Sequence, residues 1–161
     1  MKRALFAGVF FLGNVAGPAV ASCSFSNANP TYALLTQSGI ETLLGQSMAC
    51  YPTAAPYENQ EYHTGTTGSS TGNIIDYKKG PTDPVDPSKQ IGSYSIASAG
   101  ARPVYGTITY TYTGSPPSTF TYTVWGPTAP GGNLYDFCIG ATPLAGGPVR
   151  IVPAGASPVP C

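Results

Sequence analysis

The side chains best suited to chemistry lie between Glu58 and Lys89, a window that holds most of the acidic residues and the single histidine. Glu61 and His63 are two residues apart, so their side chains share a face if this segment is a strand. A carboxylate beside an imidazole can orient it for proton transfer or metal binding, with Asp76 as a further candidate. The alternative is a solvated strand face that carries a surface ion pair, since no serine or cysteine nucleophile and no second histidine completes a catalytic set.

A second acidic feature is the segment Asp83-Pro-Val-Asp86-Pro. Two carboxylates on one loop could contribute to a calcium site, but calcium needs six or more oxygen ligands and no EF-hand spacing is present. The alternative is a rigid turn, because each Asp-Pro step restricts the backbone. The glycine-rich residues 65–72 lack the lysine of a phosphate-binding loop, and we expect no cofactor.

Aromatic side chains form the other candidate site. They could line an apolar pocket or stack on a sugar, with tyrosine hydroxyl groups orienting the ligand. Alternatively, inward-pointing rings simply fill the interior of a small sheet structure. The candidates are Tyr94, Tyr105, Tyr110, Tyr112, Phe120, Tyr122 and Trp125. Trp125 falls on the threonine face of its strand, opposite Tyr122, so we expect it to be exposed and to mark a contact surface.

These aromatic residues lie in the strongest strand signal of the sequence. Residues 107–113 and 119–124 alternate threonine with tyrosine, phenylalanine or branched aliphatic residues, and residues 114–118 (GSPPS) form a turn between them. This pattern predicts an antiparallel hairpin. Further predicted strands cover residues 60–63, 72–79, 92–97, 133–139 and 149–152. Short strands without intervening helices favour an all-β antiparallel meander closed as a small barrel, with a β-sandwich as the alternative.

One short N-terminal helix is predicted within residues 31–48. Ser38 and Glu41 have the spacing of a capping box, and Gly45 can end the helix. We expect one or two turns that pack through five apolar residues. These are Leu34, Leu35, Ile40, Leu43 and Leu44.

The first residues have the pattern of a secretory signal peptide. Lys2 and Arg3 precede an apolar run, and Ala19-Val-Ala21 resembles a cleavage site. The run is too short and too interrupted to span a bilayer, so we expect residues 1–21 to be removed and residues 22–161 to form one domain in the periplasm or outside the cell. The alternative is acylation at Cys23, because Val20-Ala-Ser-Cys23 resembles a bacterial lipobox. The processed chain is mildly acidic, which argues against nucleic acid or anionic lipid as partner.

The four cysteines are expected to form two disulfides in an oxidising compartment. We favour the local pairing Cys23–Cys50 with Cys138–Cys161. Cys50–Cys138 with Cys23–Cys161 is the alternative considered. A metal–thiolate site is not expected, because the C-x-x-C spacing is absent.

Several short motifs together resemble a known group of proteins. They are Leu43-Leu-Gly45 before Cys50, Gln60-Glu-Tyr-His63, Asp76-Tyr-Lys78, Gly92-Ser-Tyr94, the tyrosine-rich hairpin and Phe137-Cys138. The set resembles small secreted lipocalin-like (calycin-type) β-barrel proteins of bacteria, which are largely uncharacterised. The Gly92-Ser-Tyr94 step is similar to the Gly-x-Trp/Tyr step that opens a strand in calycin-type barrels. The resemblance covers most of residues 43–152 and implies a barrel more than an activity.

The resulting hypothesis is an exported, non-catalytic small barrel that binds an apolar or aromatic ligand or a partner surface. The second hypothesis is a structural or interaction subunit of the cell surface, which the low charge and the Thr/Tyr-rich strands favour. A hydrolase or metal enzyme that uses His63 with Glu61 and Asp76 ranks third.

Overall fold

The computed structural model describes Cys23 and residues 31–52, 56–78, 82, 84–85, 89–145, 147–156 and 160–161. The predicted signal peptide, Asp83 and Asp86 lie outside these residues. The elements are β1 (Tyr32–Leu34), α1 (Gln37–Leu44), β2 (Ser47–Tyr51), β3 (Asn59–His63), β4 (Thr71–Lys78), β5 (Lys89–Ala99), β6 (Tyr105–Tyr112), β7 (Ser118–Pro127), β8 (Leu134–Ile139), β9 (Thr142–Pro143) and β10 (Val149–Pro153).

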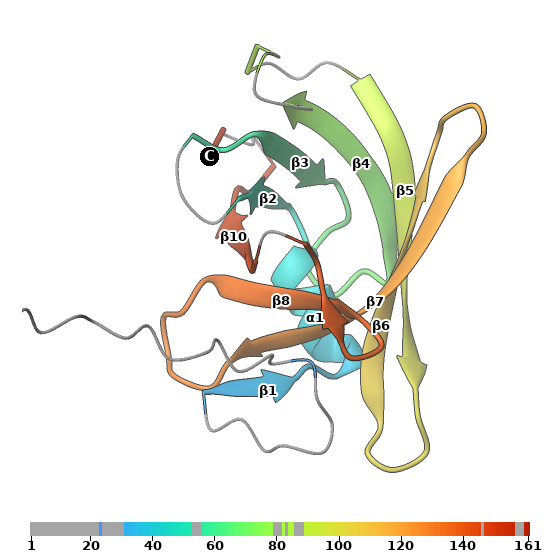
Figure 1. The fold of residues 1–161 in the computed structure, drawn as a ribbon, viewed down its shortest axis with the longest axis vertical. Helices are drawn as coiled ribbons and strands as arrows, with labels where there is room; N and C mark the ends of the chain where they lie inside the picture. The colour runs from blue at the N-terminus through green and yellow to red at the C-terminus, as the bar shows by residue number, and fades with distance from the viewer. Residues whose placement is uncertain are drawn as a thin grey trace, which may run out of the picture.

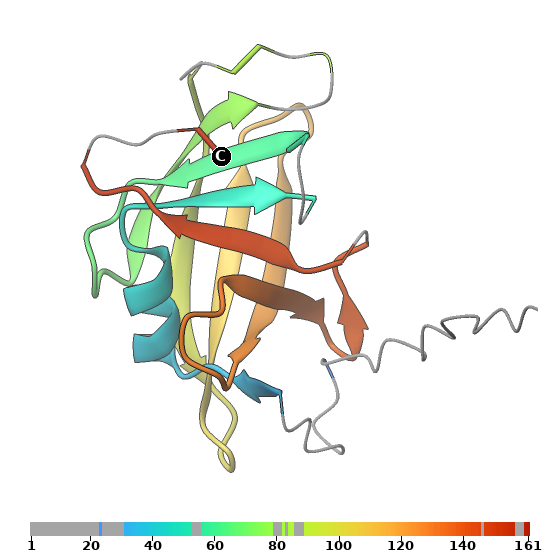
Figure 2. The same cartoon turned by 90° about the vertical axis from the view of Figure 1, so that its left-hand side faces the viewer.

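The strands form one antiparallel sheet that closes on itself. Their order is β1-β7-β6-β5-β4-β3-β2-β10-β8-β9, and an additional pairing of β7 with β8 joins eight of them into a barrel. β1 and β9 extend the sheet outside this closed set. Figures 1 and 2 show β2, β3, β8 and β10 on one side of the barrel and β4 to β7 on the other. The predicted all-β barrel is confirmed, and the sandwich alternative does not apply.

The predicted tyrosine–threonine hairpin is present as β6 and β7. Ile108 pairs with Tyr122 and Tyr110 pairs with Phe120, so the larger side chains share the inner face. The threonines lie on the outer face, where Thr109 Oγ1 and Thr121 Oγ1 are 2.9 Å apart in a hydrogen bond. Alternation of period two therefore defined both the strands and the face that each side chain occupies.

Other strands differ from the prediction at their ends. β5 is eleven residues long rather than covering only residues 92–97, so Gly92 lies inside a strand instead of opening it. A Cβ atom at Gly92 would lie 2.5 Å from the Thr111 carbonyl oxygen, so the close approach of β5 and β6 requires glycine there. β2 begins inside residues 31–48, where the sequence predicts the helix. It was not predicted as a strand because Ser47-Met-Ala-Cys-Tyr51 contains no β-branched residue.

The helix begins two residues earlier than the capping box predicts. Thr36 is the N-cap, and its Oγ1 accepts a hydrogen bond from the backbone N–H of Gly39 at 3.2 Å. Glu41 accepts instead from the Gln37 side chain at 2.7 Å, so the predicted Ser38–Glu41 capping box is wrong. Thr36 takes the capping role because its backbone is extended at the end of the connection from β1. Gly45 ends the helix as predicted, and its N–H donates to the Glu41 carbonyl oxygen.

The helix α1 closes one end of the barrel, where β5 ends and β6 begins. Ile40 and Leu44 are fully buried there and pack into the same core as Ile96 and Ile108. A Cβ atom at Gly106 would lie 2.7 Å from the backbone N of Gln37, so α1 rests directly on the β6 backbone. Figure 2 shows α1 (cyan) beside the lower end of the strands. The opposite end of the barrel has no such helix among the described residues.

The two disulfides join Cys23 to Cys138 and Cys50 to Cys161. Both pairings considered from the sequence are therefore wrong. The physical reason is barrel closure: β10 pairs with β2, which brings the C-terminal segment against the second strand of the chain. Cys23 in turn lies beside β8. Each bond consequently spans more than a hundred residues of sequence, with separations of 115 and 111.

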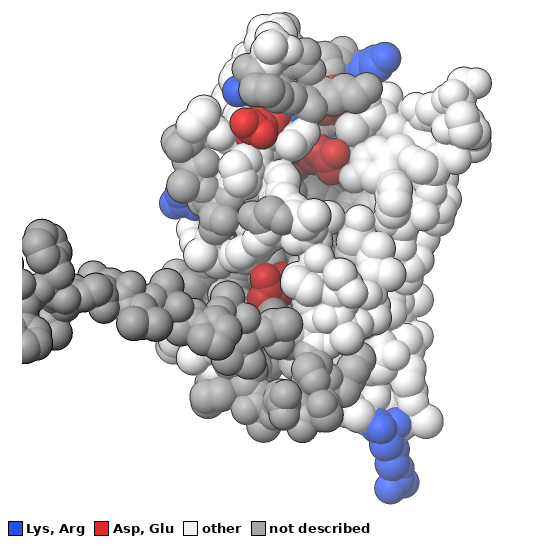
Figure 3. All heavy atoms as spheres, in the orientation of Figure 1, with Lys and Arg blue, Asp and Glu red and all other residues white. Residues whose placement is uncertain are grey.

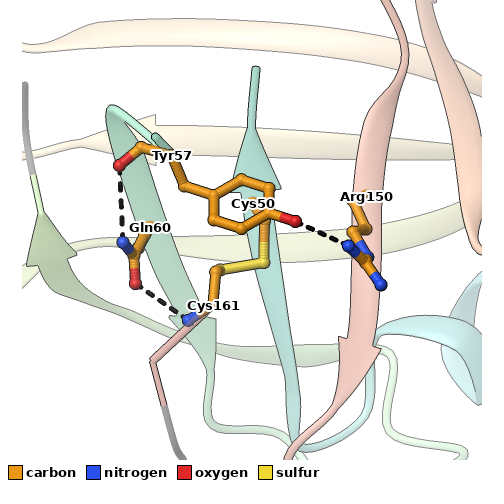
Figure 4. The surroundings of a disulfide bond; sticks show 5 residues. All are labelled: Cys50, Tyr57, Gln60, Arg150 and Cys161. Atoms are coloured by element: carbon orange, nitrogen blue, oxygen red, sulfur yellow. Dashed lines mark hydrogen bonds between the residues drawn. A yellow bond between two sulfur atoms is a disulfide. The ribbon is translucent and has the colours of Figure 1, made fainter. Parts of the chain in front are cut away.

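The Cys50–Cys161 disulfide holds the end of the chain on the outer face of β2 and β3, as Figure 4 shows. The Gln60 side chain accepts from the backbone N–H of Cys161 at 2.9 Å and lies 3.4 Å from the Tyr57 carbonyl oxygen, to which it donates. The Arg150 guanidinium donates to the Tyr57 hydroxyl at 2.6 Å. A second apolar cluster lies beneath this segment, outside the barrel. It comprises Met48, Cys50, Tyr62 and Tyr77.

Trp125 is buried, with 6% of its surface exposed, so the expectation of an exposed contact residue is wrong. Its side chain does belong to the outer face of β7, but Cys23 and Cys138 pack over it together with Tyr32 and Leu34. The sequence pattern gave the correct face. It could not show that the N-terminal disulfide would cover this face.

Candidate ligand cavity

A cavity of about 240 Å³ lies inside the barrel, toward the end opposite α1. Its wall is largely aromatic and aliphatic, with two polar side chains. The lining residues are Ala49, Tyr51, Asn59, Glu61, Tyr110, Tyr112, Tyr122, Phe137, Leu144 and Val149. Its size is below the roughly 300–1,000 Å³ typical of pockets for drug-sized ligands. The space therefore suits one small ring or a branched aliphatic group rather than a long lipid chain.

The aromatic wall is a continuous set of ring contacts. The Tyr110 ring stacks on Tyr112 with centroids 6.1 Å apart and meets the edge of Tyr122 at 6.0 Å. Phe137 of β8 contacts Tyr122 at 5.9 Å from the other side. Such contacts fix ring orientation, so the wall is largely preformed.

The barrel is weakly closed beside this cavity. Residues 123–125 of β7 pair with β8, but residues 118–122 pair only with β6 among the described strands. Phe120 points to the inner face and still has 40% of its surface exposed, because the β6–β7 hairpin extends beyond β8. Figure 1 shows this hairpin projecting past β8. This unpaired edge of β7 leaves a side on which a small molecule can approach the rings.

Glu61 is the one carboxylate among the described residues that line the cavity. Its Oε2 accepts a hydrogen bond of 3.0 Å from the Tyr112 hydroxyl. Burial raises the pKa of Glu61 to about 7, the Tyr112 hydrogen bond opposes that rise, and the charge of Asp76 adds to it. Burial likewise raises the pKa of Tyr112, and the nearby Glu61 adds to the rise. Figure 3 shows acidic atoms on this face around β3 and β4, while the surface over β5 to β7 is almost uncharged.

His63 lies deeper in the barrel and is fully buried. Its Nε2 is 2.9 Å from the Tyr110 hydroxyl, and its ring contacts Tyr94 with centroids 5.2 Å apart. Burial lowers the pKa of His63 to about 4, and a smaller contribution from the Ser47 backbone raises it. The imidazole is therefore neutral at ordinary pH, and it does not line the cavity.

The three candidate catalytic residues are brought to the barrel interior. Glu61 and His63 share the inner face of β3, and Asp76 pairs with Glu61 across the β3–β4 ladder. The Glu61 and His63 side chains, however, are hydrogen-bonded to two different tyrosines rather than to each other. The alternative interpretation of Glu61 and His63, a surface ion pair on a solvated strand face, is therefore wrong. A catalytic role for these residues stays a prediction.

Three of the predicted ligand-binding residues line the cavity: Tyr110, Tyr112 and Tyr122. Tyr94 lies beneath it against His63, and Trp125 lies on the outer side of β7. The sequence did not predict several further residues that line the cavity: Tyr51, Asn59, Phe137, Leu144 and Val149. Phe137 could have been found from its alternation with Tyr135 in β8, whereas Leu144 comes from a connection without a regular pattern.

Among the described residues, no group of three or more His, Cys, Asp or Glu is placed to hold a metal ion. The calcium candidates Asp83 and Asp86 are outside those residues. No helix in the described part of the chain is long and apolar enough to cross a membrane. All four cysteines are disulfide-bonded. The sulfur of Cys23 is therefore not available for acylation in this form of the protein.

The arrangement as a whole can enclose a small apolar group and offer it a few polar contacts. The fold is compatible with the lipocalin-like barrel that the sequence motifs resemble. No protein-family model matches this chain, and neither curated proteins nor solved structures gave a match. Lipocalin membership and a bacterial origin accordingly stay predictions from the sequence.

Proposed function

We propose that this domain is an exported, non-catalytic binding protein that takes a small, largely apolar ligand into the barrel cavity. The observation that carries the proposal is the preformed aromatic wall around about 240 Å³ of space, with Glu61 and Asn59 as orienting polar groups. A core that served stability alone would be filled to close packing at this position.

The composition of the wall supports binding over catalysis. The described lining residues include no serine, threonine, cysteine or lysine, and the cysteines are all oxidised. His63, the natural general base, is held by Tyr110 behind the wall. A bound molecule would thus meet rings and one carboxyl group, but no activated nucleophile.

Export is supported by the two disulfides, which form and persist in oxidising compartments. The N-terminal pattern adds a predicted cleavage after Ala21. Mass spectrometry of the secreted protein tests this part of the proposal, because cleavage there leaves Ser22 as the first residue. A retained N-terminal segment would contradict it.

The ligand proposal is tested by titrating the oxidised protein with 2-phenylethanol and following backbone amide resonances. We expect shifts to concentrate at the residues around the cavity, near Tyr112, Tyr122 and Phe137. Ala49→Leu adds side-chain volume to the wall and should weaken binding at least tenfold, whereas the matched change Ala97→Leu on the exposed face of β5 should not. No response to this probe, or shifts confined to the outer face, would count against the proposal.

A second candidate, an interaction module of the cell surface, is favoured by the unpaired edge of β7 at residues 118–122. An exposed strand edge can accept a strand from another chain, and Phe120 would lie at the contact. Size-exclusion chromatography with light scattering tests self-assembly of this kind. A strictly monomeric protein at high concentration argues against it.

A further inference from the structure

Among the described residues, no lysine or arginine pairs with the Glu61 carboxylate. It accepts a hydrogen bond from the Tyr112 hydroxyl, and the nearby charge of Asp76 is of the same sign. No lysine or arginine is among the described residues that line the cavity. A buried carboxylate in these surroundings is costly unless a positive charge or a proton accompanies it.

The groups around Glu61 are well suited to an organic cation. Tyr110, Tyr112, Tyr122 and Phe137 present ring faces and edges to the same space. The negative face of an aromatic ring attracts an ammonium group and also packs against an apolar body. Asn59 adds an amide oxygen that can accept a further hydrogen bond from an ammonium group.

A metal ion does not fit the same wall. Calcium takes six to eight oxygen ligands and zinc favours cysteine and histidine, whereas the cavity offers one carboxylate, one amide and phenol groups. An ammonium group loses less solvation free energy than a metal ion when it leaves water for this cavity. One carboxylate can balance its charge, and the aromatic rings surround the rest of the group. Charge complementarity therefore favours an organic cation over a hard ion.

We propose that the cavity selects small organic amines: a protonated amino group placed at Glu61, attached to a compact aromatic or branched aliphatic body that packs against Tyr110, Tyr112 and Tyr122. This inference rests on the proposed function of the cavity and specifies its ligand class. The volume of about 240 Å³ limits the body to one ring or a group of similar size.

Binding of such a cation is coupled to the proton on Glu61. The titratable groups that face this site are Asp76 on β4, Tyr110 and Tyr112 on β6, Tyr122 on β7, Tyr51 on β2 and His63 on its own strand. Burial raises the pKa of Tyr110, Tyr112 and Tyr122, and His63 is already neutral above about pH 4, so Glu61 governs the response near neutrality. An amine should bind more tightly as the pH rises through about 7, where Glu61 ionises.

The test compares three molecules of similar shape by calorimetry on the full-length oxidised chain: 2-phenylethylamine, 2-phenylethanol and 3-phenylpropanoate. At pH 8 we expect the amine to bind at least tenfold more tightly than the alcohol, and the anion more weakly than both. Glu61→Gln should abolish the preference for the amine, so that this variant binds the amine and the alcohol with equal affinity. Glu58→Gln is the matched control, because it removes the same charge outside the cavity wall and should leave all three affinities unchanged.

The outcomes separate the two proposals. Equal affinities for the amine and the alcohol in the unmodified protein would overturn amine selection while the binding function stands. Binding of none of the three would overturn the binding function itself. An equal effect of Glu58→Gln and Glu61→Gln would overturn the placement of the amine at Glu61. If Glu61→Gln fails to fold, the unmodified protein still decides: amine affinity must rise between pH 6 and 8 while that of the alcohol stays constant.

Discussion

Glu61 and His63 each form a hydrogen bond with a tyrosine hydroxyl of β6, Glu61 with Tyr112 and His63 with Tyr110. Residues two apart on β3 thus contact residues two apart on β6, across the interior of the barrel. Burial moves the two pKa values in opposite directions, to about 7 for Glu61 and about 4 for His63. Between these values the folded protein holds a proton on the carboxyl group and none on the imidazole.

The first prediction concerns the unmodified protein. Glu61 binds a proton more tightly folded than unfolded, so its contribution to stability falls as pH rises from about 4.5 to about 7. His63 binds a proton less tightly folded, so its contribution rises with pH from about 4 to about 6.5. The two slopes oppose each other at up to roughly 1.4 kcal/mol per pH unit each. The opposing contributions of Glu61 and His63 should therefore leave the free energy of unfolding, as measured with urea, nearly unchanged by this pair between pH 4.5 and 6.5.

Glu61→Gln should expose the histidine contribution. Glutamine cannot titrate, so the free energy of unfolding of this variant should follow the His63 contribution and increase from about pH 4 to about 6.5. Relative to the unmodified protein, in which Glu61 contributes less stability as it ionises, the variant should gain stability from about pH 4.5 to about 7. At pH 8 the variant should also be the more stable of the two, by up to about 3 kcal/mol, because the buried charge is gone. Urea midpoints at pH 5 and pH 8 measure both effects. A constant difference across this range would contradict the pKa assigned to Glu61.

His63→Gln should show the reverse slope. Its stability, relative to the unmodified protein, should fall as the pH rises from about 4 to about 6.5, because the variant lacks the histidine contribution that increases over this range. The variant is expected to be less stable at every pH, since it alters a fully buried ring contact with Tyr94 and Tyr110. The slope, not the overall loss, is the diagnostic quantity.

The disulfide pattern predicts one set of linked peptides. Proteolysis of the unreduced protein should yield Cys23 linked to Cys138 and Cys50 linked to Cys161, as identified by mass spectrometry. Removing Cys50–Cys161 by a double change to serine should cost up to about 4–5 kcal/mol, the chain-entropy value for a loop of this length. Peptides that link Cys23 to Cys50 would contradict the pairing directly.

Trp125, the single tryptophan, reports on the other disulfide. Its fluorescence in the native protein should resist quenching by acrylamide, because 6% of its surface is exposed. Changing Cys23 and Cys138 to serine should increase quenching, since Cys23 covers the indole. The matched control is the serine double variant at Cys50 and Cys161, which lie in a different cluster and should leave quenching unchanged as long as the protein is folded. Equal quenching in both variants would indicate that Cys23 does not shield Trp125.

The alternating strand pattern predicted much of the fold. Residues 107–113 and 119–124 alternate with period two, and this local property determines the strands, the hairpin and the inward face of Tyr110, Tyr112 and Tyr122. The helix end at Gly45 was predicted from the glycine, but the requirement for glycine there is tertiary. Its φ is −58°, and a Cβ atom at this position would lie 2.4 Å from the Thr67 Cα atom. The N-cap residue was not predictable locally either, because Thr36 and Ser38 are both suitable types and the path of the chain after β1 selects between them.

Neighbouring residues and a simple count of cysteines predicted strands β3 to β8 and β10, the faces of their side chains and the presence of two cysteine pairs. The closed barrel was needed to show which cysteines pair, that Trp125 is covered and that Glu61 lines an aromatic cavity. These features depend on β10 inserting beside β2 and on β7 meeting β8 over only three residues. Contacts between segments more than a hundred residues apart leave no local periodicity, so the closed barrel alone determines them.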